Sequence, residues 1–298
     1  MLAQQILNGL VSGMIYALFA LGFNLIFGVQ KVLNLAHGGV FMAGAFIAYY
    51  AVVLGLPFWV ALLLAMVACG LISVLIDVLG FQPLRKRSHA DAEFGAIVIS
   101  IGVDLILSSI AQRLSDTQVL NFPFGTFPVQ FFRGFDMRIS LLQITIIVLV
   151  VVMLVALMLY LKRTSFGRQV RAVALNERAA ALLGVNARAV YFQTFFIAGS
   201  MAGLAGVLIG LSFNSVHFLM GEPYMLKAFV VVVLGGLGNL PGALTASLLL
   251  GVMQTMSVAY LPAGLSDTLI FSLLFVVLLF WPNGLFGGAA VPAGMGRQ

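Results

Sequence analysis

Charged residues are scarce in this sequence. Lysine, arginine, aspartate and glutamate make up 8% of the 298 residues, whereas apolar residues make up 62%. A soluble domain of ordinary composition is about 25% charged and about 45–50% apolar. This deficit of charge excludes a soluble enzyme, a disordered protein and a nucleic-acid-binding protein. The chain is therefore predicted to be an all-α polytopic membrane protein.

Residues that carry chemistry are also few. Cys69 is the single cysteine, which excludes an internal disulfide, and the three histidines show no metal-ligand spacing. The sequence contains no phosphate-binding G-x-x-x-x-G-K-S/T pattern and no G-x-S-x-G nucleophile motif. We therefore expect no catalytic residue, no metal, no cofactor bound by this chain and no ATP hydrolysis of its own.

The apolar residues form eight segments long enough to predict membrane helices. They cover residues 5–27, 38–54, 58–79, 94–114, 139–161, 189–211, 225–260 and 266–286. The seventh is too long for one simple span and is interrupted by a glycine-rich stretch at 235–242. The whole chain, 1–298, is predicted to be one transmembrane permease-like domain.

Basic residues predict the orientation. With the N-terminus outside, the cytoplasmic loops receive ten basic residues: Lys31, Arg85, Lys86, Arg87, Lys162, Arg163, Arg168, Arg171, Arg178 and Arg188. The outside then receives four, Arg113, Arg133, Arg138 and Lys227, with Arg297 on the tail. Because cytoplasmic loops are enriched in lysine and arginine, we predict that the N-terminus is outside.

Two stretches 190 residues apart share residues. The matches are Gly9 with Gly199, Gly13 with Gly203, Leu18 with Leu208, Leu21 with Leu211, Phe23 with Phe213 and Asn24 with Asn214. These matches predict an inverted repeat, an arrangement in which the transport pathway lies at the interface between the repeats. The alternative is that the matches arise by chance, because membrane helices are built from few residue types. The four-residue glycine spacing itself indicates close helix packing, with flexing during transport as the alternative.

Polar residues interrupt the apolar segments where no real loop exists. Irregular backbone at membrane depth is tolerated only where it is buried in protein or lines a wet cavity. The break at 30–39 is therefore predicted to line a path or to pin a re-entrant turn, and a hydrogen-bonded turn histidine is the simpler interpretation of its histidine. The candidate pathway residues are Asn24, Asn34, His37, Gly38, Gly39, Asp104, Asn214, Gly235, Gly236 and Gly238.

Asp104 lies near the middle of the fourth segment. A carboxylate inside a membrane is costly and is a functional candidate by default. The alternative is a hydrogen-bonded or protonated aspartate that holds helices together. The sequence names no partner for it.

The longest polar stretch, 162–188, is predicted to be a cytoplasmic loop that holds two short helices, 166–175 and 177–183. Ser165 and Asn176 suit helix N-caps, and Gly184 suits the position that ends a helix. Such an amphipathic element can dock in a partner's groove or lie on anionic lipid. If one helix continued across Asn176, Arg168, Arg171 and Arg178 would share one face. The opposite face would hold Val170, Val173, Leu182 and Leu183.

Three stretches resemble LivH-like permease subunits of bacterial branched-chain amino-acid ABC transporters. They are GLVSGMIYALFALGFNLIFGVQKVLNLAHGGVFMAGAF at 9–46, RAVALNERAAALLGVNARAV at 171–190 and VVVLGGLGNLPGALTASLLLG at 231–251. The resemblance implies a subunit of the bacterial inner membrane that pairs with a second homologous permease. It also implies two ATP-binding cassette subunits, which use the ATP, and a periplasmic substrate-binding protein.

In such permeases a cytoplasmic EAA-like loop contacts the ATPase, and residues 171–186 match it in position. Arg178 stands directly before Ala179, where the general pattern has an acidic residue, and Glu177 is shifted by one. The salt-bridge partner on an ATPase therefore stays open. The expected coupling residues are Arg168, Arg171, Asn176, Glu177, Arg178, Ala179, Ala180 and Gly184.

The expected function is ATP-driven alternating access for branched-chain, aliphatic amino acids, which pass without chemistry. One alternative is an ion-coupled secondary transporter of small polar solutes, in which Asp104 or Glu222 titrates during the cycle. Another is a permease of the same family for amides or urea. An integral-membrane enzyme would need a cluster of catalytic residues that the sequence does not offer.

Overall fold

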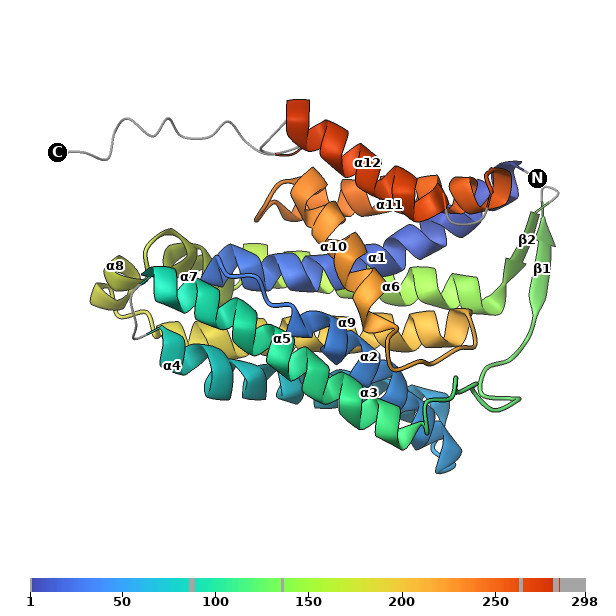
Figure 1. The fold of residues 1–298 in the computed structure, drawn as a ribbon, viewed down its shortest axis with the longest axis horizontal. Helices are drawn as coiled ribbons and strands as arrows, with labels where there is room; N and C mark the ends of the chain where they lie inside the picture. Colours follow the sequence, from blue (N-terminus) through green and yellow to red (C-terminus); the bar gives the residue numbers. More distant parts are fainter. Residues whose placement is uncertain (1, 86–88, 135–136, 263–264, 281–283, 285–298) are drawn as a thin grey trace.

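The computed structural model describes residues 2–85, 89–134, 137–262, 265–280 and 284. Long helices lie side by side along one direction, with a β-hairpin at one end of the bundle (Figure 1). Within the described residues, seven helices are long and apolar enough to cross a membrane. The predicted all-α polytopic class is confirmed, and the predicted number of about eight spans is close. Lys86, Arg87 and Arg297, used in the charge count, lie outside the described residues.

The helices and strands follow each other in a simple order. They are α1 (Leu2–Gln30), α2 (Ala36–Val53), α3 (Phe58–Ile76), the π-helical segment η1 (Asp77–Phe81), α4 (Gln82–Leu84), α5 (His89–Leu114), β1 (Phe131–Gly134), β2 (Met137–Ser140), α6 (Leu141–Arg163), α7 (Ser165–Leu175), α8 (Glu177–Leu182), α9 (Ala187–Ser212), α10 (Gly221–Gly235), α11 (Leu240–Tyr260) and α12 (Leu265–Phe280).

The predicted segments map onto these elements with few changes. The first six correspond to α1, α2, α3, α5, α6 and α9, and the seventh divides at its glycine break into α10 and α11. The eighth corresponds to α12, and residues 281–283 and 285–286 of that segment lie outside the described residues. The third helix continues through η1 and α4 to Leu84, beyond its predicted end at 79.

The loop between α5 and α6 holds a feature that sequence analysis missed. Strands β1 and β2 pair antiparallel, from Phe131 opposite Ser140 to Gly134 opposite Met137. Ser140 then caps α6, because its side chain accepts from the Gln143 backbone and the Gln143 side chain accepts from the Ser140 backbone. Strands of four residues are too short to show the alternation of polar and apolar residues that predicts a strand. They depend on pairing with each other and on the cap that follows.

Glycines set the closest helix contacts. A Cβ added to Gly9 would lie 2.6 Å from Val252 Cα, and one added to Gly13 would lie 2.9 Å from Leu248 Cα. Gly203 approaches α3 in the same way, since its added Cβ would lie 2.7 Å from Cys69 Cβ. Small residues allow this approach where lipid supplies no hydrophobic drive between helices. These contacts support the packing interpretation of the four-residue spacing.

The two halves that share residues also share an arrangement. α1 and α9 are in contact and run in opposite directions, and each is followed by a short break and a second helix (Figure 1). The second helices, α2 and α10, also contact each other. This is the geometry that an inverted repeat predicts.

Candidate functional site

α2 begins halfway along α1 rather than beside its end. The chain leaves α1 at Lys31, which is left-handed (φ 56°), and returns along the helix. His37 then lies on Phe19, with Nε2 3.3 Å from the Phe19 carbonyl oxygen and ring centroids 4.8 Å apart. Phe19 lies about 16 Å from Gln30, the last residue of α1, at 1.5 Å of rise per residue. The chain therefore doubles back along α1 before α2 begins, and the fully buried His37 contacts the middle of α1.

The N-termini of α2 and α10 meet at this depth. A Cβ added to Gly38 would lie 3.1 Å from the Gly221 carbonyl oxygen, so the two backbones touch. Helix N-termini carry partial positive charge, and half-helix N-termini near the bilayer midplane point at anionic substrate groups in transporters. The partial positive charges of two helix ends therefore lie close together.

Two acidic side chains accompany this meeting point. Asp104 on α5 accepts a hydrogen bond from the Gly39 backbone, and a Cβ added to Gly39 would lie 2.7 Å from Asp104 Oδ1. Glu222 follows Gly221 in the first turn of α10, where it is exposed. The partner that the sequence could not name for Asp104 is thus the N-terminus of α2. Acidic groups at this depth normally face a water-filled cavity or another protein rather than lipid.

Lys227 does not lie in an outer loop, as the charge count assumed. It belongs to α10, is 9% exposed, and its Nζ lies 5.3 Å from the Tyr224 ring centroid and 5.9 Å from that of Tyr16. Aromatic faces stabilise such a cation. The sequence does hold a signal for this position. Lys227 follows Tyr224 by three residues inside an apolar run, a spacing that places both side chains on one face of a helix.

Asn24 pins the glycine break between α10 and α11. Its Oδ1 accepts from the Gly238 backbone at 2.8 Å, and its Nδ2 donates to the Asn239 carbonyl at 3.3 Å. Gly236 and Gly238 both have positive φ, 88° and 81°, which side-chain-bearing residues rarely adopt. Gly235 packs its Cα against Ala243 of α11. The predicted pathway residues 235, 236 and 238 therefore form one tight turn tied to α1.

Asn214 ties a second break to its surroundings. It is left-handed (φ 45°), its Oδ1 accepts from the Phe122 backbone at 2.9 Å, and its carbonyl accepts from the Asn121 side chain. Asn34, by contrast, is 2% exposed, and within the described residues neither its Oδ1 nor His37 Nδ1 has a hydrogen-bond partner. The structure thus brings Asn34, His37, Gly38, Gly39 and Asp104 to one region and keeps Asn214 in another. A pathway role for any of these residues stays a prediction.

The predicted coupling loop forms α7 and α8 at the end of the bundle opposite the β-hairpin (Figure 1). Asn176 caps α8 as predicted, since its Oδ1 accepts from the Ala179 backbone at 3.0 Å, and Gly184 has the expected positive φ of 82°. The predicted cap at Ser165 is wrong by one residue. Thr164 is the cap, and its Oγ1 accepts from the Gly167 backbone at 3.4 Å.

The helix break at Asn176 changes which side chains share a face. Of the four apolar residues predicted to lie opposite the arginines, Val170 and Val173 are buried, but Leu182 and Leu183 are 89% and 83% exposed, because the helix breaks at Asn176. The two valines and the two leucines therefore do not form one continuous apolar face. Leu175 is also 84% exposed. The remaining coupling residues Arg168, Arg171, Glu177, Arg178 and Ala179 are exposed, whereas Ala180 is buried.

A cavity of about 530 Å³ opens between α1, α6, α9 and α11. One face of α1 supplies Asn8, Ser12 and Tyr16, and Tyr16 donates to Gln254 Oε1 of α11 at 2.9 Å. The lining residues carry no charged side chain, and the volume suits a small solute. The sequence signal for this polar face is the spacing of four between Asn8, Ser12 and Tyr16 along α1.

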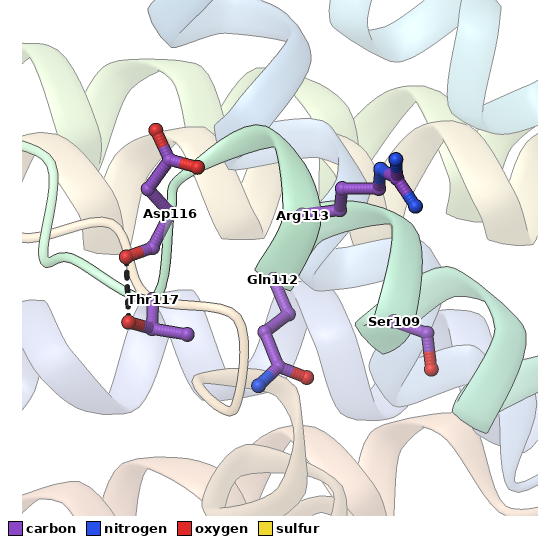
Figure 2. Close-up of a pocket in the computed structure, with 5 residues that line it drawn as sticks. All are labelled: Ser109, Gln112, Arg113, Asp116 and Thr117. Atoms are coloured by element: carbon purple, nitrogen blue, oxygen red, sulfur yellow. Dashed lines mark hydrogen bonds between the residues drawn. The ribbon is translucent and has the colours of Figure 1, made fainter.

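A second hollow, of about 510 Å³, lies at the end of α5. Figure 2 shows that the Arg113 and Asp116 side chains point away from each other, and Ser109 and Gln112 do not converge with them. Thr117 donates to the Asp116 carbonyl at 2.5 Å. Side chains that do not converge build no binding site, so we assign no role to this hollow.

Comparison with known proteins places these features in context. Residues 5–279 match the family model of the branched-chain amino acid transport system permease component. The chain is 31% identical to LivH, the high-affinity branched-chain amino acid transport system permease protein of Salmonella typhimurium, and 33% identical to BraD of Pseudomonas aeruginosa, over 95% of each chain. A solved structure of PsaBC from Streptococcus pneumoniae aligns with 94% of this chain and 92% of that one, at a TM-score of 0.49 and 14% identity.

Proposed function

This chain belongs to the family of branched-chain amino acid transport system permease components, and from that membership we propose that it forms the membrane path of an ABC importer for branched-chain, aliphatic amino acids. It is a multi-pass membrane protein. We propose that it lies in the bacterial inner membrane among lipids, with its N-terminus outside. The solute passes through without chemical change.

One observation carries the proposal: two helix N-termini meet beside two carboxylates, next to the middle of α1. An amino acid is a zwitterion, so its carboxylate suits the positive ends of α2 and α10. Its ammonium group suits Asp104 and Glu222. The uncharged cavity between α1 and α11, lined in part by Ser12 and Tyr16, favours solutes whose side chain carries no charge.

The partners follow from the same family. We propose a second homologous permease, two ATP-binding cassette subunits that hydrolyse ATP, and a periplasmic binding protein that delivers the amino acid. The exposed leucines of α7 and α8 support docking of an ATPase at this end, because large exposed apolar side chains together mark interaction sites. ATP binding would move α8, and the two breaks at 31–35 and 236–239 would change conformation as access alternates between the two sides.

Transport in a defined system tests the substrate. The permease, its partner permease, the ATPases and the binding protein are reconstituted in vesicles, and ATP-dependent uptake of labelled leucine is measured. Competition by isoleucine and valine, but not by urea or acetamide, is the expected result. Competition by amides alone would assign the chain to amide transport, and uptake driven by a proton gradient without ATP would refute the ABC mechanism.

Matched variants test the meeting of the two N-termini. Gly221→Ala adds a methyl group where the Gly38 backbone lies, so leucine uptake should fall severely. Gly102→Ala is the control, since a Cβ there meets no atom within 4 Å. Equal uptake by the two variants would argue against a close approach of α2 and α10.

A second pair of variants tests docking. Leu182→Ser removes an apolar side chain that is 89% exposed on α8, whereas Leu54→Ser removes one that is 82% exposed at the turn before α3. We expect the first variant to lose co-purification of the ATPases and the second to keep it. Retention of the ATPases by Leu182→Ser together with Leu183→Ser would exclude docking through these leucines.

A further inference from the structure

Glu177 of α8 does not extend freely toward a docking partner. Its Oε2 accepts a hydrogen bond from the Tyr191 hydroxyl of α9 at 2.8 Å. Tyr191 is 5% exposed, so this contact ties α8 inward to the helix bundle. An acidic residue expected to meet an ATPase therefore has a partner in its own chain.

The contact continues deeper into the bundle. The Arg85 guanidinium carbon lies 3.6 Å from the Tyr191 ring centroid, a cation–π contact, and the same guanidinium forms an ion pair with Asp77. Asp77 also accepts from Gln30 Nε2, near the end of α1, at 3.0 Å. Five side chains from α8, α9, α3 with its extension, and α1 thus form one continuous polar chain.

The side chains that form the polar chain are partly buried, which restricts their movement. The Asp77 side chain is 5% exposed and that of Arg85 21% exposed. A buried carboxylate that lost its guanidinium would remain uncompensated at large cost, so Asp77 and Arg85 move together. Tyr191, held between Arg85 and Glu177, then sets the distance between α8 and the third helix.

The polar chain passes through the part of the third helix that departs from α-helical geometry. Asp77 is the first residue of the π-helical segment Asp77–Phe81, in which the Gln82 backbone N–H bonds to the Asp77 carbonyl, five residues earlier. Pro83 follows and has no N–H to donate, which removes one regular helical bond. π-helical turns are often found at functional sites. The hydrogen bonds of a π-helical turn can shift to the α-helical pattern. The backbone at this point can therefore change its path slightly without breaking the helix.

We propose that Arg85 and Tyr191 are positioning residues that transmit displacement of α8 to the π-helical turn and to the end of α1. The inference rests on the proposed function in one respect, that an ATPase docks on α7 and α8. Through Gln30 the displacement reaches the break at 31–35, which leads to the N-terminus of α2. The polar chain therefore connects the docking end to the meeting point of α2 and α10.

The first test measures coupling in the reconstituted transporter. Tyr191→Phe removes only the hydroxyl, and Tyr160→Phe is the control, because Tyr160 donates a comparable bond to Gln193 at 3.0 Å outside this chain of contacts. For Tyr191→Phe we expect ATPase co-purification and ATP hydrolysis to persist, while leucine moved per ATP falls by about tenfold, the scale of a hydrogen bond to a charged group. An unchanged ratio, or an equal fall in Tyr160→Phe, would overturn the inference.

A double-mutant cycle separates transmission from general loosening. Glu177→Ala lies on an exposed helix and removes the same hydrogen bond from its other end, while Glu177→Gln keeps an acceptor oxygen. The double variant Tyr191→Phe with Glu177→Ala should be no worse than either single variant, and Glu177→Gln should recover part of the ratio. Additive losses would overturn the inference.

A distance measurement keeps the inference separate from the choice of substrate. Spin labels at Ala179→Cys in α8 and Val78→Cys in η1 report the spacing that the polar chain sets; Cys69 is fully buried and stays unlabelled. A nucleotide-dependent shift that is present in the parent protein and reduced by Tyr191→Phe supports transmission, even if leucine is not the solute. An equal shift in both would exclude transmission, whereas failure of leucine uptake in the parent protein would refute only the proposed substrate.

Discussion

Replacing Asn24 with alanine should release the glycine break from α1. The side chain is 1% exposed and makes two bonds to the break, from Gly238 N–H at 2.8 Å and to the Asn239 carbonyl at 3.3 Å. Hydrogen bonds between membrane helices contribute about 0.6 kcal/mol each on average and about 1.7 at most. Losing both should therefore destabilise the break by about 1–3 kcal/mol, and the stranded Gly238 N–H favours the upper part of that range.

Hydrogen exchange measures this effect directly. A loss of about 2 kcal/mol raises a local opening equilibrium about thirtyfold, so amides at 236–240 should exchange that much faster in Asn24→Ala. Ser247→Ala is the control, because its hydroxyl donates within its own helix to the Leu244 carbonyl. Protection of these amides that is unchanged in Asn24→Ala, or lost equally in the control, would refute the assignment of Asn24 as the anchor of this turn.

Three further predictions concern single positions. Gly13→Leu should prevent the approach of α1 to α11 and abolish accumulation of folded protein in the membrane, whereas Gly102→Ala should be tolerated, as size-exclusion profiles in detergent would show. Asp104→Asn keeps an acceptor oxygen for the Gly39 backbone but removes the negative charge proposed to meet the substrate's ammonium group, so ATP-driven uptake should persist with a raised KM for leucine; an unchanged KM would refute that role of Asp104. Thr164→Ala should destabilise α7 by about 1 kcal/mol through loss of its N-cap, and Ser165→Ala should not, a difference that thermal unfolding would resolve and that equal melting of the two variants would contradict.

The regular parts of the fold could be predicted because their signals are local. An apolar run of about 20 residues predicts a membrane helix whatever surrounds it, and the boundaries of α6 and α9 agree within a few residues. Asn176 was identified as a cap for the same reason, since the bond it makes lies within three residues. Thr164 was missed because Thr164 and Ser165 are both good caps, and only the direction of the chain leaving α6 selects between them.

The candidate site was harder to predict because its contacts cross the sequence. The break at 30–39 was recognisable as polar, but nothing in it says that His37 lies on Phe19. A single face that holds both Val170 and Leu182 needs one helical period across Asn176, but the helix breaks there. Lys227 was counted with the outer residues although it lies inside the predicted segment 225–260, and its aromatic neighbours could not be predicted because Tyr16 and Tyr224 come from different helices.

Composition, period and local motifs were enough to predict the class of the molecule, the approximate extent of its spans, the position of its breaks and the family to which it belongs. What the breaks contact could be learned only from the folded arrangement of the helices. The depth at which α2 and α10 meet, the backbone partner of Asp104 and the chain of contacts from Glu177 to Gln30 join residues up to 183 positions apart. Such contacts arise from packing whole helices against each other, and no local pattern encodes the outcome.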